Sequence, residues 1–555
     1  MDKHLQNLLD ILNQNKLIDA ERIITNLNTH YKNSEDFLFL FGIYLFKKKD
    51  FKKSLEIFYK VKNFNNRHYD ALFNIGVCHQ ILGEFDLAIE HYEKCISIQP
   101  LKSDNYYQIA ICLSFKKEFE KSNQYLKKSI EIAPSALFYL AYSKNLRELG
   151  KFDESIYFVD LALNLNKQFI PAILTKIELN IDLGKYAKAT SIINQLLGYN
   201  NNNDTIAKAK TALGKIAINQ GNYEKAIKIN EEIILLSPEN FNAKYNLAIA
   251  YLFLKNYKLG WKYHETRFNL QRLSLLRQNL KYLIKPRWNN SLPKKNLLIW
   301  GEQGIGEQIL YSKFIDIIYD EVENLIIAVN KKLVKFFKNI YPNCQVIDYQ
   351  YLKSFDKYDC HIPMGSLGYH FQDKLIKKIL INKKLISTNN LNLPSKKKIR
   401  CGISWKSTNS KIGHKKSIQL KDLIKIFSNF DLEFINLQYT FDNDEIFEVE
   451  KSLNKKIFLE HSVDCFDDIN GLAELIQTCD FVITVSNSNA HVAGKIGVKT
   501  FLLLPATDGK LWYWGSKNDS EILWYESITP IRQTVDGNWE LVIEKLFSCI
   551  EKTCN

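Results

Sequence analysis

The apolar positions in the first half of the chain repeat with a period of about 34 residues. A phrase that pairs an aromatic residue or leucine with a small residue three positions later recurs eight times. Its first position falls at Leu17, Phe51, Phe85, Phe119, Phe152, Tyr186, Tyr223 and Tyr257. The successive steps are 34, 34, 34, 33, 34, 37 and 34 residues, and the long step contains a polar insertion at residues 198–204. This regularity predicts one repeated structural unit.

Each unit has the pattern of two antiparallel helices joined by a tight turn. The small residue lets the two backbones approach, and Pro100, Pro134 and Pro238 lie where a second helix would end. One helix pair cannot bury its own apolar face, so neighbouring pairs must stack into a superhelix. The stretch "ALFNIGVCHQILGEFDLAIEHYEKCISIQP" (71–100) resembles the tetratricopeptide repeat. We therefore expect an all-α repeat superhelix of about eight helix pairs over residues 1–268.

The resemblance implies a concave groove that binds a protein or peptide. Three amide side chains share the helix position that faces this groove in the family: Asn74, Gln108 and Asn246. A continuous ladder of amides would resemble the superhelix of the protein O-GlcNAc transferases. Four other units carry no amide at this position: Leu40, Ala141, Thr175 and Ala212. Ordinary polar surface is the alternative interpretation.

The second half alternates strand and helix patterns. After a linker at 269–294, apolar runs such as "NLLIWG", "NLIIAVN", "IRCGISW" and "DFVITVS" are separated by helical segments. Continuous apolar runs of this kind predict parallel strands covered on both faces. A weak stretch divides them into two Rossmann-like lobes, at 295–394 and 395–555. Ligands of such sheets bind beyond the carboxyl ends of the strands.

Several segments of this half resemble a family of transferases. They are "GWKYHETRF" (260–268), "KPRWNNSLPKKNLLIWGEQGIGEQILYSKFI" (285–315), "CGISWKS" (401–407), "DFVITVSNSNAHVAGKIGVKTFLLLP" (480–505) and "WYWG" (512–515). They look like bacterial proteins that join tetratricopeptide repeats to a B-type glycosyltransferase domain akin to the heptosyltransferases. The resemblance implies transfer of a sugar from a nucleotide-sugar donor to an acceptor hydroxyl, without a metal or other cofactor.

The donor is expected in the second lobe, at the strand-to-helix junction around residue 487. Ser486, Asn487 and Ser488 precede or open a helix whose N-terminal N–H groups and dipole suit a diphosphate. His491 follows in the first turn and is a candidate contact to the diphosphate or sugar; its alternative is a structural histidine. Heptosyltransferases usually carry an Asp-Thr pair where this chain has Ser486 and Asn487, which weakens the case for a heptose donor.

A second candidate group leaves the first strand of the same lobe. Trp405 and Lys406 follow that strand directly, and the resemblance implies that the lysine neutralises the leaving diphosphate. Lys416 and Ser417 occupy the family's later basic-Ser position. A plain surface lysine is the alternative for Lys406, and the sequence does not decide between Lys416 and its basic neighbours.

The loop "WGEQGIGEQI" (300–309) of the first lobe is expected to face the acceptor. Gly304 and Gly306 would let the backbone approach sugar and phosphate groups without a Cβ clash. The resemblance places Glu307 where heptosyltransferases carry an Asp proposed to deprotonate the acceptor hydroxyl. Glu302 is a second candidate. The alternative is that Glu307 only caps the helix that follows.

Composition narrows the classes of partner. The net charge is +14, but only nine of the 75 basic residues are Arg and the lysines form no block, so no nucleic-acid partner is expected. The ten cysteines have no metal-ligand spacing, and Asp442–Asp444 lies in an unsupported polar loop, so no metal is expected. No run approaches the ~18 apolar residues of a membrane span, and no signal peptide opens the chain. We expect a cytoplasmic protein without a membrane span.

A non-catalytic scaffold is the rival interpretation. In that case the repeats would bind proteins and a degenerate transferase domain would hold a nucleotide or partner without turnover. Glu307 in place of Asp, and Ser486-Asn487 in place of Asp-Thr, favour it. The retained glycines, Lys406 and helix-start residues favour the enzyme.

Overall fold

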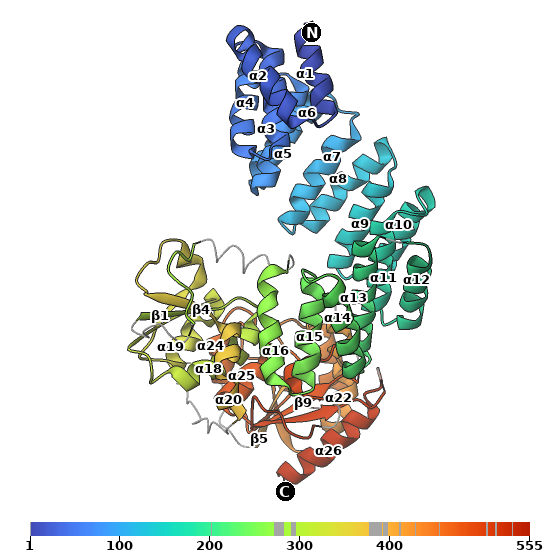
Figure 1. The fold of residues 1–555 in the computed structure, drawn as a ribbon. Coiled ribbons are helices and arrows are strands. Elements are labelled where there is room, and N and C mark those ends of the chain that lie inside the picture. Colours follow the sequence, from blue (N-terminus) through green and yellow to red (C-terminus); the bar gives the residue numbers. More distant parts are fainter. Residues whose placement is uncertain are drawn as a thin grey trace. The chain divides into compact units, whose positions relative to one another are not determined.

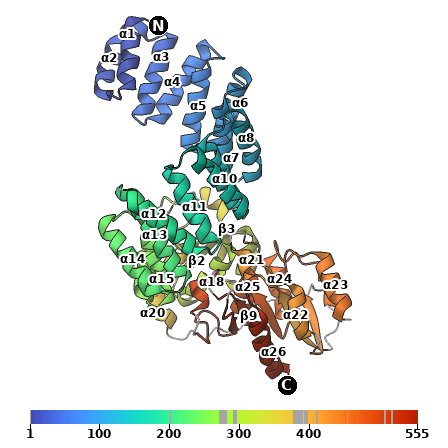
Figure 2. The ribbon, with the colours of Figure 1, turned by 90° about the vertical axis from the view of Figure 1, so that its right-hand side faces the viewer.

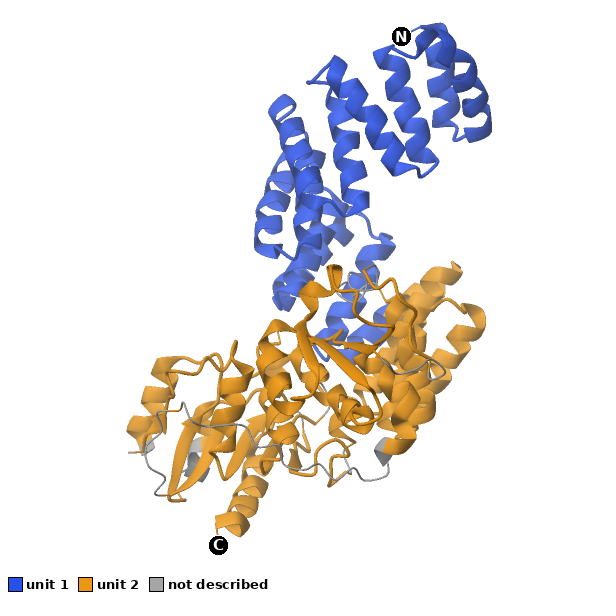
Figure 3. Ribbon diagram, turned by 90° about the vertical axis from the view of Figure 1, so that its left-hand side faces the viewer, with its two compact units in different colours: residues 1–192 blue, residues 193–555 orange. Residues whose placement is uncertain are grey.

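The structure is a computed structural model. It describes residues 2–200, 202–270, 282–289, 296–376, 391, 398–409, 412–427, 429–453, 455–506, 509–516, 519–535 and 537–554. Most of the linker expected at 269–294 and the lobe boundary expected at residue 394 lie outside these ranges. The chain forms two compact units, residues 1–192 and 193–555 (Figure 3).

Antiparallel helix pairs make up the whole first unit and the start of the second (Figures 1 and 2). The helices that lie within the first unit are α1 (Lys3–Asn13), α2 (Leu17–Tyr31), α3 (Glu35–Lys47), α4 (Phe51–Phe64), α5 (Tyr69–Leu82), α6 (Phe85–Ile98), α7 (Ser103–Phe115), α8 (Phe119–Ile132), α9 (Ala136–Glu148), α10 (Phe152–Leu165) and α11 (Ile170–Asp182). After α12 (Tyr186–Tyr199), the second unit contains α13 (Asn203–Asn219), α14 (Tyr223–Leu236), α15 (Phe241–Phe253), α16 (Tyr257–His264) and the 3-10 turn η1 (Glu265–Asn269). The predicted all-helical repeats are confirmed.

The small residue of the repeated phrase lies where the two helices of a pair touch. Where it is serine, its hydroxyl donates to a backbone carbonyl of the facing helix. The three such bonds run from Ser54, Ser122 and Ser155 to Gly42, Ala110 and Ser143, at 2.8, 2.7 and 2.7 Å. A larger side chain would hold the helices apart, which explains the small residue in every unit.

Each pair also turns through a residue in the left-handed backbone conformation, two positions before the phrase begins. Glycine fills this position in four units and a residue with a side chain fills it in the other four. The residues are Asn15, Lys49, Gly83, Lys117, Gly150, Gly184, Gly221 and Lys255, with φ between 58° and 79°. The helix-ending turn is therefore set by the repeat and not by glycine alone.

The first α/β lobe is built on a four-stranded parallel sheet in the order β3-β2-β1-β4. The strands are β1 (Asn296–Trp300), β2 (Asn324–Val329), β3 (Gln345–Asp348) and β4 (Cys360–Pro363). The helices are α18 (Ile305–Ile318), α19 (Val334–Ile340) and α20 (Leu367–Ile376), with 3-10 turns η2 (Lys331–Leu333), η3 (Tyr349–Lys353) and η4 (Met364–Ser366). Strand β1 is central, so the loop that leaves it opens at the middle of the sheet's carboxyl edge.

The second lobe has a six-stranded parallel sheet in the order β10-β9-β8-β5-β6-β7. Its strands are β5 (Ile399–Ser404), β6 (Leu432–Asn436), β7 (Ile457–Phe458), β8 (Phe481–Val485), β9 (Thr500–Leu504) and β10 (Ile528–Arg532). Its helices are α21 (Gly413–Lys416), α22 (Leu420–Phe427), α23 (Asn443–Leu453), α24 (Ile469–Gln477), α25 (Ser488–Ile496) and α26 (Glu540–Cys554), with the 3-10 turn η5 (Trp512–Trp514). The predicted parallel-sheet α/β region is confirmed.

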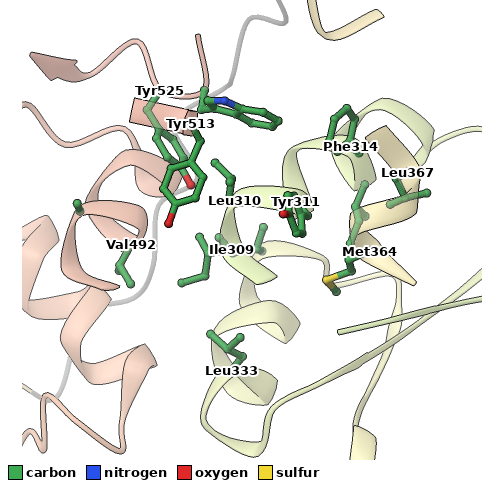
Figure 4. Close-up of a cluster of buried hydrophobic side chains, with 14 of the residues drawn as sticks. Ile309, Leu310, Tyr311, Phe314, Leu333, Met364, Leu367, Val492, Tyr513 and Tyr525 are labelled. Carbon is green, nitrogen blue, oxygen red and sulfur yellow. The ribbon is translucent and has the colours of Figure 1, made fainter. Parts of the chain in front are cut away.

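One buried apolar cluster joins the last repeat helices to both lobes. Figure 4 shows side chains of α18 between Met364 and Leu367 of the first lobe and Val492, Tyr513 and Tyr525 of the second. Trp261 of α16 is fully buried in the same cluster and makes edge contacts with Tyr311, Phe314, Trp512 and Trp524. The second unit therefore shares a continuous core. No helix within the described ranges is long and apolar enough to cross a bilayer.

Candidate functional site

The glycines of the loop after β1 each lie against a protein side chain. A Cβ atom on Gly301 would lie 2.4 Å from Oε1 of Gln308, and one on Gly306 would lie 2.8 Å from Cδ2 of His491. A Cβ on Gly304, which caps α18, would lie 2.8 Å from Oε2 of Glu307. The structure thus gives these glycines a packing role, and their approach to a ligand stays a prediction.

Glu307 lies in the first turn of α18 with its carboxylate folded back over the end of the helix. The carboxylate accepts a hydrogen bond from its own backbone N–H, so it caps the helix as the alternative interpretation expected. Its side chain is partly accessible but densely surrounded by protein. Desolvation therefore raises its pKa, while the N–H and Lys416 act in the opposite direction. A raised pKa makes this carboxylate a stronger base than an ordinary glutamate.

Lys416 ends α21 and is only 4% exposed. Burial lowers its pKa to about 8, and the carboxylate of Glu307 works against this shift. No carboxylate of the described residues lies within ion-pairing distance of its ammonium group. Gly509, at φ 82°, leaves room for the stem of this lysine, because a Cβ there would lie 3.1 Å from Cγ of Lys416. Among the described residues, Lys416 is thus a buried cation without a direct ion-pair partner.

His491, in the first turns of α25, is a neutral imidazole. Burial, and secondly the charge of Lys416, lowers its pKa to about 3. Its Nδ1 lies 3.0 Å from the hydroxyl of Tyr525, and its ring centroid lies 4.6 Å from that of Trp514. Gly306 approaches the opposite edge of the ring. A neutral histidine in this setting can donate or accept one hydrogen bond and cannot supply charge.

At the junction between β8 and α25, the side chains of Ser486 and Asn487 are hydrogen-bonded to other groups of the protein. Asn487 caps α25 by accepting from the N–H of Asn489, and its amide donates to Ser404 and to the carbonyl of Lys406. Ser486 accepts a hydrogen bond from the indole of Trp514 at 2.9 Å. Ser488 is the first residue of α25. These contacts fix the helix end rigidly beside β5.

Trp405 and Lys406 leave β5 as predicted, but both contact Glu445. The Lys406 ammonium lies 2.5 Å from Oε2 of Glu445, and the fully buried Trp405 donates its indole N–H to the same oxygen at 3.3 Å. Ser417 donates to the carbonyl of Gly413. Of the two predicted phosphate-binding lysines, Lys416 therefore has the less compensated charge. Glu445 was missed, because nothing in its local sequence marks it.

Three buried tyrosines lie within electrostatic reach of Glu307, and none of them was predicted. Tyr311 and Tyr513 are buried residues whose pKa values are raised by burial and next by the charge of Glu307; the pKa of Tyr525 is likewise raised by burial. Tyr245, on repeat helix α15, acts electrostatically on both Tyr311 and Tyr513. Helix α15 thus lies within electrostatic reach of two of these three tyrosines. "WYWG" was a visible signal for Tyr513, whereas Tyr245 had none.

The second carboxylate candidate, Glu302, is committed elsewhere. It is almost fully buried and accepts from Nε of Arg267 at 2.8 Å. Arg267 also pairs with Glu265 and donates to Ser366. This network joins η1, which follows the last repeat, to the first lobe, so Glu302 has a structural role.

The predicted groove residues are half-buried, and two of them are bonded within the repeats. The amide of Asn74 donates to the carbonyl of Asp70 in its own helix, and that of Asn246 donates to Thr211 and Asn230. Gln108 has intermediate exposure. Both N–H groups of the Asn246 amide are thus used within the repeats, Asn74 uses one of its two, and peptide binding by these side chains stays a prediction.

Within the described residues, no group of three or more His, Cys, Asp or Glu side chains is arranged to hold a metal ion. Asp442 accepts from the N–H of Asp444 at the start of α23, which gives this pair a capping role.

Comparisons with known proteins identify the repeats. One tetratricopeptide-repeat model matches residues 69–100 and a second matches residues 103–135 and 207–240, so the chain carries tetratricopeptide repeats as predicted. Protein FlbA of Caulobacter vibrioides is 23% identical over 440 residues, which are 71% of this chain and 69% of FlbA.

Solved structures of repeat proteins are similar at a lower level. A tetratricopeptide repeat protein from Parabacteroides merdae is 16% identical, with a TM-score of 0.38, over 45% of this chain and 97% of its own. PilF of Pseudomonas aeruginosa is 16% identical, with a TM-score of 0.32, over 35% of this chain and 88% of its own.

Proposed function

We propose that the two lobes form a B-type glycosyltransferase that moves a sugar from a nucleotide-sugar donor to an acceptor hydroxyl. One observation carries the proposal: Glu307, beyond the carboxyl end of β1, lies within electrostatic reach of Lys416, in the segment that leaves β5. A base and a cation from two parallel sheets meet where ligands of such sheets bind.

The second lobe supplies the donor side. The N-terminus of α25 offers backbone N–H groups to a diphosphate, and Lys416 offers the positive charge that its leaving oxygens need. His491, neutral and fixed by Tyr525, contributes a hydrogen bond to the diphosphate or sugar. No metal ion is required for this arrangement.

The first lobe supplies the base. The acceptor oxygen attacks the anomeric carbon as its proton passes to the carboxylate of Glu307. The bond between the sugar and the diphosphate breaks, and its electron pair leaves with the nucleoside diphosphate beside Lys416. Glu307 must first turn away from its own backbone N–H, because that bond now holds its carboxylate.

The repeats recruit the acceptor or a partner protein. Tetratricopeptide superhelices present a concave surface suited to protein segments, and helix α15 reaches the site through Tyr245. A protein acceptor held along the repeats is therefore delivered near Glu307.

Calorimetric titration of the full chain with UDP, ADP, GDP and CMP tests the donor site. We expect one nucleotide to bind at micromolar concentration with or without EDTA, and to lose at least tenfold in affinity in Lys416→Met. Lys406→Met is the matched control, because its ammonium group already pairs with Glu445. Turnover of the matching nucleotide-sugar should then be lost in Glu307→Gln. If no nucleotide binds at millimolar concentration, the transferase proposal is wrong.

The second candidate function is a protein-binding scaffold. Two observations support this alternative. Glu307 caps its own helix, and the loop glycines pack against Gln308, Glu307 and His491. A chain that binds protein partners but no nucleotide would have this function.

A further inference from the structure

A cavity of about 350 Å³ lies between the last repeat and the second lobe, and it is separate from the residues proposed for donor binding. We call it the repeat–lobe pocket. Leu252, Phe253 and Tyr257 line one side, and Trp512, Tyr513 and Trp524 line the other. An apolar, aromatic lining with few polar groups is typical of a ligand site.

The lining restricts the class of ligand. The volume is at the small end of ligand pockets, which run from roughly 300 to 1,000 Å³, so a nucleotide-sugar is a poor fit. Trp512 is 8% exposed and Trp524 is 1% exposed, so the accessible apolar area of the pocket is small. What remains is an apolar surface that a single large side chain can cover.

The charged residues at the pocket favour a ligand that carries a positive charge beside its large apolar side chain. Lys255 lies 2.7 Å from Oδ1 of Asp519, which also accepts hydrogen bonds from Ser516, so the charge of Asp519 is compensated. Glu521 is exposed at the pocket and makes no ion pair with another described residue. Its carboxylate complements a lysine or arginine.

We propose that the repeat–lobe pocket binds a large apolar side chain of a protein segment that carries a basic residue next to it. Leu523, which is 38% exposed, supplies the apolar rim, and Glu521 faces the basic neighbour. Helices α15 and α16 provide three of the lining residues, so the segment would arrive along the end of the repeats.

Tyr513 belongs both to the docking site and to the surroundings of the proposed base, Glu307. It lines the pocket and is also within electrostatic reach of Glu307. Tyr513 is therefore the residue that connects the repeat–lobe pocket with the surroundings of Glu307.

Ligand-observed NMR with the full chain tests the docking site without any donor. The probes are the N-acetyl dipeptide amides Phe-Lys, Phe-Glu and Ala-Lys at millimolar concentration. We expect Phe-Lys to bind severalfold more tightly than the other two. Leu523→Asp should weaken the binding of Phe-Lys and Phe-Glu, because both use the apolar rim.

A charge-reversal variant distinguishes a loss of ligand recognition from a loss of folded protein. Glu521→Lys changes an exposed side chain, and it should reverse the preference so that Phe-Glu binds more tightly than Phe-Lys. Equal binding of the three probes, no binding, or a preference that Glu521→Lys leaves unchanged would overturn the proposal. These outcomes do not depend on transferase activity, since neither nucleotide nor sugar is present.

Discussion

Gly306 of the first lobe and His491 of the second are in direct contact, because a Cβ atom on Gly306 would lie 2.8 Å from Cδ2 of the histidine. His491 cannot retreat easily, since Tyr525 and Trp514 hold its other sides. The first turns of α18 and α25 therefore meet with no room for a methyl group. This contact sets the spacing between the first turns of α18 and α25.

Gly306→Ala should therefore destabilise the protein. Overpacking of this kind costs about 1–3 kcal/mol, against a gain of up to ~1 kcal/mol from helix propensity. Urea unfolding measures the difference. Gly198→Ala is the matched control, because nothing lies within 4 Å of a Cβ at Gly198, and it should stabilise the protein. A Gly306→Ala variant more stable than the wild type would contradict the prediction.

Lys416→Met should stabilise the protein while it removes nucleotide binding. Burial holds the pKa of Lys416 at about 8, against 10.5 for an ordinary lysine, so keeping the charge at neutral pH costs up to about 3 kcal/mol. Methionine has a similar length and no charge. Chemical unfolding at pH 7 should show a gain of this order or smaller. Lys406→Met is the control: it removes a more exposed ion pair and should change the free energy of unfolding by less than about 1 kcal/mol. A lower free energy of unfolding in Lys416→Met than in the wild type would contradict the prediction.

The same lysine predicts a pH dependence. Between pH 8 and about 10.4 the unfolded chain keeps the Lys416 proton that the native state has lost, so the contribution of this group to stability rises with pH. Below pH 8 the penalty is constant. The difference in unfolding free energy between wild type and Lys416→Met should therefore shrink across this window. Nucleotide affinity of the wild type should fall over the same range as the ammonium group deprotonates. If the difference in unfolding free energy between wild type and Lys416→Met does not change with pH, Lys416 is not buried as a cation.

Periodic features were predictable and the local assembly of the site was not. The repeats follow from a 34-residue period, and the sheets follow from apolar runs, because both patterns reflect burial on one face or two. Burial of Lys416 rather than Lys406, in contrast, depends on residues distant in the sequence, such as Gly509, which packs against the Lys416 side chain. Tyr245 belongs to a repeat helix and approaches Tyr311 and Tyr513 only through tertiary packing, which no spacing in the chain reveals.

The loop glycines show a similar limit. Their positions between a strand and a helix predicted an approach to phosphate or sugar. In the structure each missing Cβ is matched by Gln308, Glu307 or His491. A glycine indicates that another group approaches the backbone closely. The sequence does not show whether this group belongs to a ligand or to another side chain.

Removal of Arg267 should be strongly destabilising. Its guanidinium group is fully buried and pairs with Glu265 and Glu302, whose Oε2 has no hydrogen-bond partner. Arg267→Met would leave the buried carboxylate of Glu302 without its cation, at a cost of about 3–5 kcal/mol, while Glu265 keeps its pair with Arg287. Adding Glu302→Leu should recover part of that loss, because it removes that carboxylate. Losses that simply add in a double-mutant cycle would contradict a coupled pair.

The turn residues of the repeats offer a stabilising substitution. Lys117 has a φ of 64°, in the left-handed region that costs a residue with a side chain about 1–2 kcal/mol and glycine almost nothing. Lys117→Gly should raise the free energy of unfolding by about 0.5–1 kcal/mol, because the greater entropy of unfolded glycine offsets part of the gain. Lys127→Gly, at an exposed position inside α8, is the control and should lower stability by about 1 kcal/mol. Both changes remove the same side chain, so only the backbone conformation differs. Thermal unfolding of the two variants, read by circular dichroism, should therefore shift in opposite directions, and a parallel loss would mean that the Lys117 side chain itself stabilises the turn.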